Sequence, residues 1–196
     1  MQSLFITATG TNVGKTHTTV QLIELLSDRG LAVGAYKPIE TGVGTIAHDA
    51  SLLLKACQKV NENFKHFTPE EITAYTFPLP AAPFCADTNH EISLDKIMDR
   101  FHALSKLCDI LLVEGAGGLM VPITKDFMMI DLIEKLGSDV LLVTPSRLGC
   151  INETLLSREA VCGIYSFEIA QTKAHQVKQK AKQNEFPLLA TIEEDR

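Results

Sequence analysis

The sequence lacks the concentrated positive charge and the long apolar segments that mark two large classes of protein. Its 196 residues contain 18 Lys and Arg against 24 Asp and Glu, which gives a formal net charge of −6. Because a protein that coats nucleic acid needs clustered positive charge, we expect no nucleic-acid partner. No run approaches the ~18 apolar residues of a membrane-spanning helix, so we expect no membrane partner either.

Paired cysteines are also missing. The five cysteines are odd in number and show no CxxC spacing, which does not favour a disulfide framework or a zinc site. The N-terminal residues have neither the basic region nor the apolar stretch of a signal peptide. Reduced thiols and no signal peptide lead us to expect a cytoplasmic protein.

The remaining composition, 45% hydrophobic and 21% charged residues, is typical of a globular protein with a substantial core. Short apolar segments alternate with helical patterns, and strands that are apolar on both faces imply a parallel sheet covered on both sides. The pattern therefore predicts an α/β fold, a doubly wound and mostly parallel sheet with helices on both faces. Expected strands are 3–8, 31–36, 110–113 and 140–143; expected helices are 15–29, 49–60, 93–107, 130–136 and 150–161.

Other segments have weaker patterns. Residues 61–91 are rich in Pro, Thr and aromatics, and we interpret them as mostly loop. The polar segment 171–183 carries several lysines, which indicates a solvated helix face more than an anion-binding patch. Residues 186–192 are apolar enough to form a last strand.

The strongest local signal lies between the first expected strand and helix, where residues 8–16 read ATGTNVGKT. Such a loop points successive backbone N–H groups at one place and adds the N-terminal dipole of the helix, and both favour a bound phosphate. Lys15 would reach the β- and γ-phosphates of a nucleotide, and the Thr16 hydroxyl would ligate Mg²⁺. The strict GxxxxGK[ST] pattern fails because Thr9 takes the place of its first glycine, so Gly10 has to supply the freedom of the loop.

Two later segments add charged residues near expected strand ends. Glu114 ends an apolar strand and precedes Gly115, at the edge where open α/β sheets bind ligands. Lys37 ends the second strand and should face the same crevice as Lys15, which suits a phosphoryl transfer or a carboxylated intermediate. Asp49 begins the next helix, either as its N-cap or as a further Mg²⁺ ligand. No guanine-reading Asn-Lys-x-Asp is present, which does not favour a switch GTPase.

Five motifs in this order resemble those of the dethiobiotin synthetase family of P-loop NTPases, over about residues 5–156: TGTNVGKT, YKPIETG, HDA, VEGAGGLMVPI and RLGCIN. The resemblance implies an ATP-dependent ligase of biotin biosynthesis. Its substrates would be 7,8-diaminononanoate, CO₂ or bicarbonate, and ATP, and it would form dethiobiotin, ADP and phosphate through an N-carbamate and a carbamic-phosphoric anhydride. We expect one domain over residues 1–196, with a short divergent C-terminal region from about 163, and a homodimer with active sites at its interface.

The resemblance also implies roles for individual residues. Lys37 matches the lysine that is the active-site residue of the family. Lys15 and Thr11 would act beside it on the reacting anions. The family's Mg²⁺ ligands match Thr16, Asp49 and Glu114. Its nucleotide-binding positions match Asn12, Val13, Gly14, Lys15, Thr16, His17, Asp49, Glu114, Gly115, Ala116 and Gly117. Its substrate-binding positions match Thr41 and Lys37 together with Gly149, Cys150, Ile151 and Asn152 of the neighbouring subunit.

Alternative functions remain open from the sequence. The main one is a regulatory P-loop ATPase switch of the ParA/MinD type, although such loops carry an extra early lysine where this chain has residues 9–11 as Thr-Gly-Thr. A relative that activates another carboxylate and a nucleotide-binding pseudoenzyme are further candidates. Members of the resembled family typically read adenine with an Asn-Asp pair that residues 163–170 lack, so we expect weak base selectivity.

Overall fold

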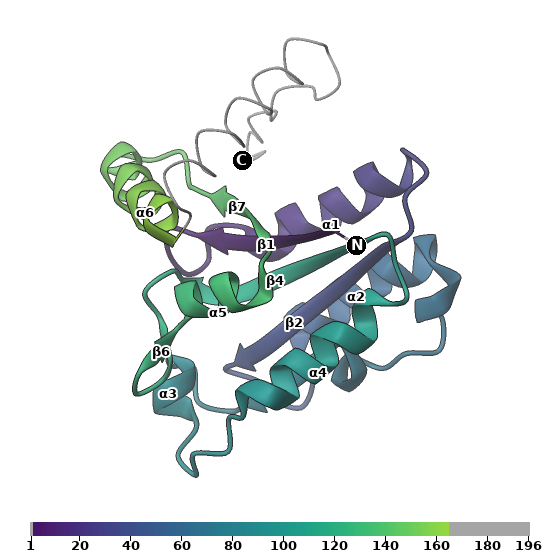
Figure 1. Ribbon diagram of the computed structural model, residues 1–196, viewed down its shortest axis with the longest axis horizontal. Coiled ribbons are helices and arrows are strands. Elements are labelled where there is room, and N and C mark those ends of the chain that lie inside the picture. Colours follow the sequence, from purple (N-terminus) through teal and green to yellow (C-terminus); the bar gives the residue numbers. More distant parts are fainter. Residues whose placement is uncertain (1, 165–196) are drawn as a thin grey trace. The chain divides into compact units, whose positions relative to one another are not determined.

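The computed structural model describes residues 2–164 (Figure 1). The chain divides into two units, Met1–Arg158 and Glu159–Arg196, and the first contains every element below except the end of α6. The strands are β1 (Gln2–Ala8), β2 (Val33–Thr41), β3 (Thr73–Phe77), β4 (Ile110–Gly118), β5 (Pro122–Thr124), β6 (Phe127–Met128) and β7 (Asp139–Val143). The α-helices are α1 (Lys15–Ser27), α2 (His48–Val60), α3 (Pro83–Ala86), α4 (Leu94–Ser105), α5 (Met129–Leu136) and α6 (Cys150–Ile164), with 3₁₀ turns at Glu62–Phe64 and Pro69–Ile72.

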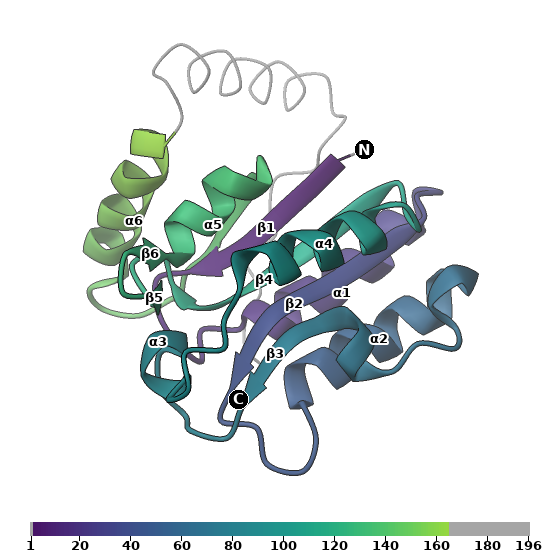
Figure 2. The same ribbon diagram turned by 60° about the horizontal axis from the view of Figure 1, so that its bottom comes forward.

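Five strands form one parallel sheet in the order β3-β2-β4-β1-β7. Helices α1 and α2 lie on one face of this sheet and α4 and α5 on the other (Figure 2). The predicted doubly wound α/β fold is therefore confirmed. Strand β4 pairs with both β1 and β2, so the carboxyl ends of these three strands are adjacent.

The core forms where helices cover both faces of the central strands. Phe5 and Ile6 of β1 and residues 111–113 of β4 are fully buried, as their apolar sequences require. On β2, the buried Tyr36 hydroxyl donates a hydrogen bond to the carbonyl of Ile97 in α4, at 3.0 Å. Burial of this group raises the pKa of Tyr36 far above its usual range, so the phenol stays a donor that fixes α4 to the sheet.

The predicted elements are present, but two strands run further than expected. Strand β2 continues to Thr41 and β4 to Gly118, so Lys37 and Glu114 lie within strands rather than at their ends. The extended β2 contains Pro38, although proline removes a ladder hydrogen bond. Pro38 lies beyond the last register pair of β2 with β4, Tyr36 with Val113, so its missing N–H costs that ladder nothing.

Residues 61–91 contain a strand that the sequence analysis missed. Strand β3 pairs with β2 at the edge of the sheet, over register pairs from Lys37–Thr73 to Thr41–Phe77. Its five residues stand close to prolines on both sides, which hid the strand pattern. The interpretation of this segment as mostly loop was wrong to that extent.

Several expectations lie partly or wholly outside the described residues. These are the single domain over residues 1–196, its divergent region from about 163, the polar segment 171–183 and the last strand at 186–192. Within the part of the chain that the structure describes, no helix is both long and apolar enough to span a membrane.

Candidate active site

A cavity of about 490 Å³ lies at the carboxyl ends of β1, β4 and β2. Segments that are far apart in the sequence meet there: the loop after β1, the end of β2, the first turn of α2 and the residues after Glu114 in β4. The lining residues are Thr11, Asn12, Gly14, Lys15, Thr16, His17, Lys37, Glu40, Thr41, Gly42, His48, Asp49, Ala116 and Gly117. Most residues predicted to bind the nucleotide or to act in catalysis therefore share one cavity.

The loop between β1 and α1 has the backbone that a phosphate-binding loop needs. Gly14 has a φ of 96° and Asn12 a φ of 58°, and glycine and asparagine are the residues that adopt this left-handed region most easily. Helix α1 begins at Lys15 without a side-chain cap on its first N–H groups. Since such groups need partners, they form a suitable site for an anion.

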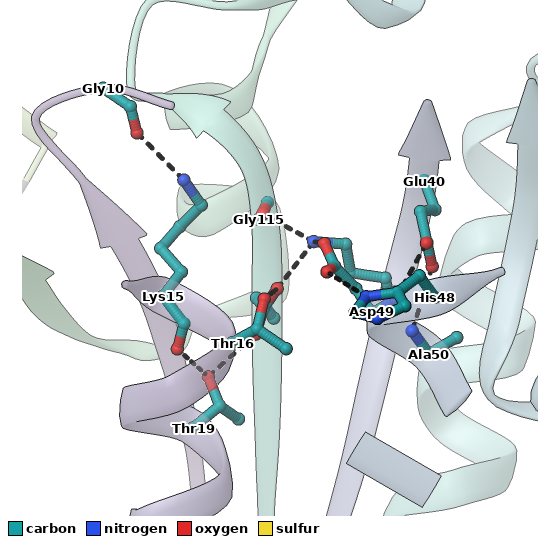
Figure 3. A network of polar contacts seen from close by, with 11 residues as sticks. Gly10, Lys15, Thr16, Thr19, Glu40, His48, Asp49, Ala50 and Gly115 are labelled. Carbon is teal, nitrogen blue, oxygen red and sulfur yellow. Dashed lines mark hydrogen bonds and ion pairs between the residues drawn. The ribbon is translucent and has the colours of Figure 1, made fainter. Parts of the chain in front are cut away.

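Lys15 bends back onto this loop. Its ammonium donates a hydrogen bond to the carbonyl of Gly10 at 2.9 Å (Figure 3). Burial and the nearby charge of Lys37 lower the pKa of Lys15 to about 8, against the opposing effect of Glu114 and Asp49. Lys15 therefore titrates close to physiological pH.

Lys37 connects the two carboxylates of the site. Its ammonium lies 2.6 Å from Oε1 of Glu114, 2.9 Å from Oδ2 of Asp49 and 3.3 Å from the carbonyl of Gly115. Lys37 is 3% exposed and Glu114 is fully buried. Burial favours neutral Lys37, but Glu114 and Asp49 outweigh it and raise the pKa of Lys37 above its usual value.

The carboxylate of Asp49 is correspondingly held in its charged form. Burial acts to raise its pKa, but the charge of Lys37 and hydrogen bonds with Lys37 and Thr16 together lower it. Asp49 lies in the first turn of α2, and Ala47 occupies the N-cap position. The interpretation of Asp49 as an N-cap was therefore wrong, and its side chain points to the site instead.

Both oxygens of Glu114 accept hydrogen bonds from threonines of α1. Thr16 donates to Oε1 and Thr19 to Oε2, each at 2.9 Å, and the Thr19 hydroxyl also lies 2.8 Å from the carbonyl of Lys15 (Figure 3). Thr19 is fully buried. Its role was missed, although its position three residues after Thr16 on a helix places both hydroxyls on one face.

The predicted metal ligands Thr16, Asp49 and Glu114 thus gather within one hydrogen-bonded network. Within residues 2–164, no group of three or more His, Cys, Asp and Glu side chains is arranged to hold a metal ion. Two carboxylates and a hydroxyl are nevertheless the hard oxygen donors that suit Mg²⁺, which usually completes its shell with water and phosphate oxygens. The residues present fit that ion as a partner of a nucleotide.

Glu40 is a second residue that the sequence analysis missed. Its carboxylate accepts hydrogen bonds from the backbone N–H groups of Asp49 and Ala50, both at 2.9 Å. The one signal in the sequence was an acidic residue next to the apolar residues of a strand. Only the structure shows that the N-cap position of α2 is Ala47, which has no side chain that can cap the helix. Glu40 supplies that cap from β2.

Some predicted residues do not line the cavity. Glu114 is fully buried and is not among the lining residues, although it contacts Lys37 and Thr16, which are. Val13 is also absent from the lining, and Gly115 contributes only its carbonyl, to Lys37. Gly149, with a φ of 93°, precedes the first residue of α6, and the segment 149–152 is also absent from the cavity lining. A contribution of this segment to the site of a neighbouring subunit remains a prediction.

Replacing Thr19 with valine should test the network around Glu114. Valine keeps the shape of the side chain but removes the donor to Oε2, which leaves a buried carboxylate oxygen without that partner. We expect the free energy of unfolding to fall by about 1–3 kcal/mol, measured by urea denaturation. Thr18→Val on the partly exposed side of α1 is the matched control; equal losses in both variants would contradict the role given to Thr19.

Comparison with known proteins agrees with the geometry. A family model described as an AAA domain matches residues 2–170, and one for the ATP-dependent Clp protease adaptor protein ClpS matches residues 157–191. The ATP-dependent dethiobiotin synthetase BioD of Sulfurovum sp. (strain NBC37-1) is 68% identical over 161 residues, which are 82% of this chain and 77% of that protein.

Two further relatives carry the same name. The dethiobiotin synthetase of Wolinella succinogenes is 42% identical over 163 residues, 82% of this chain and 75% of its own. That of Aquifex aeolicus (strain VF5) is 41% identical over 157 residues, 79% of this chain and 67% of its own. The resemblance found in the five motifs is thereby confirmed, and the chain belongs to the ATP-dependent dethiobiotin synthetase family.

Proposed function

We propose that this protein is an ATP-dependent cyclo-ligase that converts 7,8-diaminononanoate, CO₂ and ATP into dethiobiotin, ADP and phosphate. The observation that carries the proposal is one cavity lined by Lys15, Lys37 and Asp49, with the buried Glu114 in contact with Lys37. The names of its relatives support the same activity. Dethiobiotin formation places the enzyme in biotin biosynthesis, and we expect it to act in the cytoplasm.

The reaction gathers negative charge, which explains the cations. One amine attacks CO₂ and loses a proton, which gives a carbamate. A carbamate oxygen then attacks the γ-phosphorus of ATP, and ADP leaves. The second amine attacks the carbonyl carbon of this mixed anhydride, phosphate leaves, and the ureido ring is closed. Both the carbamate and the transferred phosphoryl group are anions, so fixed cations stabilise their approach.

The residues of the chain divide this work. The loop residues 12–17 bind the phosphates through backbone N–H groups, and Lys15 neutralises their charge. Lys37, held by Asp49 and Glu114, orients and stabilises the carbamate, and Thr11 donates a hydrogen bond to the reacting anions. Thr41 lines the same cavity and binds the diamine.

Thr16, Asp49 and Glu114 are the side chains that would hold Mg²⁺. The ion supplies charge neutralisation at the β- and γ-phosphates when it is bound. The same two carboxylates hold Lys37, so the nucleotide, the metal site and the lysine share one charge network.

We further propose a homodimer in which residues 149–152 of one subunit bind the carboxylate of the diaminononanoate held by the other. The first N–H groups of a helix can bind such a carboxylate, although that of Cys150 already donates to the carbonyl of Arg147. Leu148, Ile151 and Leu156 support an interface here, because they are 99%, 75% and 65% exposed. Neighbouring apolar side chains left in water are typical of interaction surfaces.

The test of this function is an assay with purified protein, ¹³C-bicarbonate, 7,8-diaminononanoate and ATP with Mg²⁺. We expect dethiobiotin that carries the ¹³C label, detected by mass spectrometry, and ADP release that requires the diamine. ATP turnover of the same rate without the diamine would favour a ParA/MinD-type switch instead.

Nucleotide selectivity gives a second test. The residues expected to hold the nucleotide contact its phosphates, and residues 163–170 contain no Asn or Asp to read the base. We therefore expect comparable kcat/KM values for ATP, GTP and CTP in dethiobiotin formation. A strong preference for ATP would show that residues outside this set recognise adenine.

A further inference from the structure

We propose that Glu40 is a positioning residue that fixes Asp49 at the cavity and thereby sets the affinity for the Mg²⁺-bound nucleotide. This inference rests on the proposed function only for its nucleotide and its metal ion. Glu40 lines the cavity but is only 6% exposed. A buried carboxylate at a binding site needs a physical reason, because burial without partners is costly.

The reason is the way in which helix α2 begins. The first N–H groups of a helix have no partner within the helix. Ala47, at the N-cap, has no side-chain oxygen, and no side-chain cap is present there. Glu40 accepts the N–H of Asp49 with Oε1 and that of Ala50 with Oε2. Hydrogen bonds to a charged acceptor are strong, and the helix dipole favours the negative charge at this end.

These two bonds act on the part of α2 that faces the site. They fix the backbone of Asp49, whose carboxylate then reaches Lys37 at 2.9 Å. The backbone N–H groups of Gly42 and Val43 donate to the carbonyls of Leu79 and Phe77, which fixes the start of the intervening segment. Gly44 gives the rest of that segment little stiffness of its own. Glu40 and the Lys37–Asp49 ion pair together tie the first turn of α2 to β2.

Glu40 acts through Asp49 and not by contact with a ligand. Each of its two oxygens already accepts a backbone N–H at 2.9 Å, and little of the side chain reaches the solvent. Each oxygen keeps a further acceptor site, but the side chain is only 6% exposed, so little of it is left for contact with a ligand. A change at Glu40 should therefore affect binding only where Asp49 contributes to it, which is in the presence of the divalent ion.

A matched control exists elsewhere in the chain. Asp87 is 5% exposed, and its two oxygens accept the backbone N–H groups of Glu91 and Ile92, both at 2.8 Å. Asp87 does not line the cavity. Glu40→Gln and Asp87→Asn thus each remove a hydrogen bond from a backbone N–H to a carboxylate, the first beside the cavity and the second away from it. We expect similar decreases in thermal stability for the two variants.

The experiment measures ATP dissociation constants by calorimetry, with Mg²⁺ and with EDTA. We expect Glu40→Gln to weaken binding about tenfold or more with Mg²⁺, as for other residues that orient metal ligands, and to change it little in EDTA. Asp87→Asn should leave both constants unchanged. In an Asp49→Asn background, Glu40→Gln should add no further loss.

Three results would overturn the inference: unchanged Mg²⁺-dependent binding in Glu40→Gln, equal weakening with Mg²⁺ and EDTA, or a full additional loss in the Asp49→Asn background. Should Glu40→Gln fail to fold, Glu40→Asp keeps the charge but shortens the side chain, and the same Mg²⁺-specific loss is expected. These readouts do not need catalysis. Failure of the wild-type protein to form dethiobiotin would refute the proposed function. The ATP dissociation constants would still test whether Glu40 positions Asp49.

Discussion

Replacing Lys37 with alanine should abolish dethiobiotin formation and also destabilise the protein. The ammonium of Lys37 contacts Glu114, which is fully buried, and Asp49. Its removal leaves the Glu114 charge in the interior without its nearest cation. Breaking a buried pair in this way typically costs about 3–5 kcal/mol. We therefore expect a loss of stability of that order, in addition to the loss of the cation that stabilises the carbamate.

Product formation and urea denaturation measure the two effects separately. Mg²⁺ should restore part of the lost stability of Lys37→Ala, because the two carboxylates freed from the lysine can bind a divalent cation. Lys125→Ala is the control, since Lys125 is exposed and lies away from the cavity. Near-normal ring closure by Lys37→Ala would contradict the role given to this lysine, and wild-type stability would contradict the importance of its ion pairs.

The affinity for ATP should fall as the pH rises above about 8. Burial and the charge of Lys37 lower the pKa of Lys15 to about 8, so the free protein loses this cation in that range. Phosphate binding favours the charged form, and each further pH unit should weaken binding by up to about tenfold until the pKa of the complex is reached. Lys37 stays protonated there, because its pKa is raised.

Calorimetric titration with ATP between about pH 7.5 and 9.5, in EDTA, measures this dependence. Lys15→Arg should show a nearly flat profile, since a guanidinium does not lose its proton in this range. A flat profile of the wild-type protein would show that Lys15 does not bind the phosphates or does not titrate there. Without nucleotide, the same shift has the opposite consequence: above about pH 8 the unfolded chain binds more protons, so the free energy of unfolding rises with pH.

The fold was predictable because its central strands are unambiguous. Apolar runs such as residues 111–113 have to be buried on both faces, and segments with helical patterns separate them. Strand β3 and the extension of β2 past Pro38 could not be predicted, because both form through the pairing of these two strands with each other. Local pattern does not contain that information.

The site was predictable to the level of motifs and less so to the level of contacts. The sequence predicted that Lys15, Lys37 and Glu114 would face one crevice, since each follows or ends a strand of a parallel sheet. It did not predict that Lys37 would form ion pairs with both carboxylates, because that depends on the pairing of β2 with β4 and on the start of α2. The role of Glu40 was not predicted for the same reason, because its hydrogen-bond partners are backbone N–H groups of α2, beyond the loop that follows β2.

A crystal structure with an ATP analogue, Mg²⁺ and 7,8-diaminononanoate would locate the reacting groups relative to the two lysines. We expect the γ-phosphate between the ammonium groups of Lys15 and Lys37, with one amine of the substrate beside Lys37 and Thr41. Phosphates bound away from the loop of residues 12–17, or a diamine bound remote from Lys37, would contradict this arrangement.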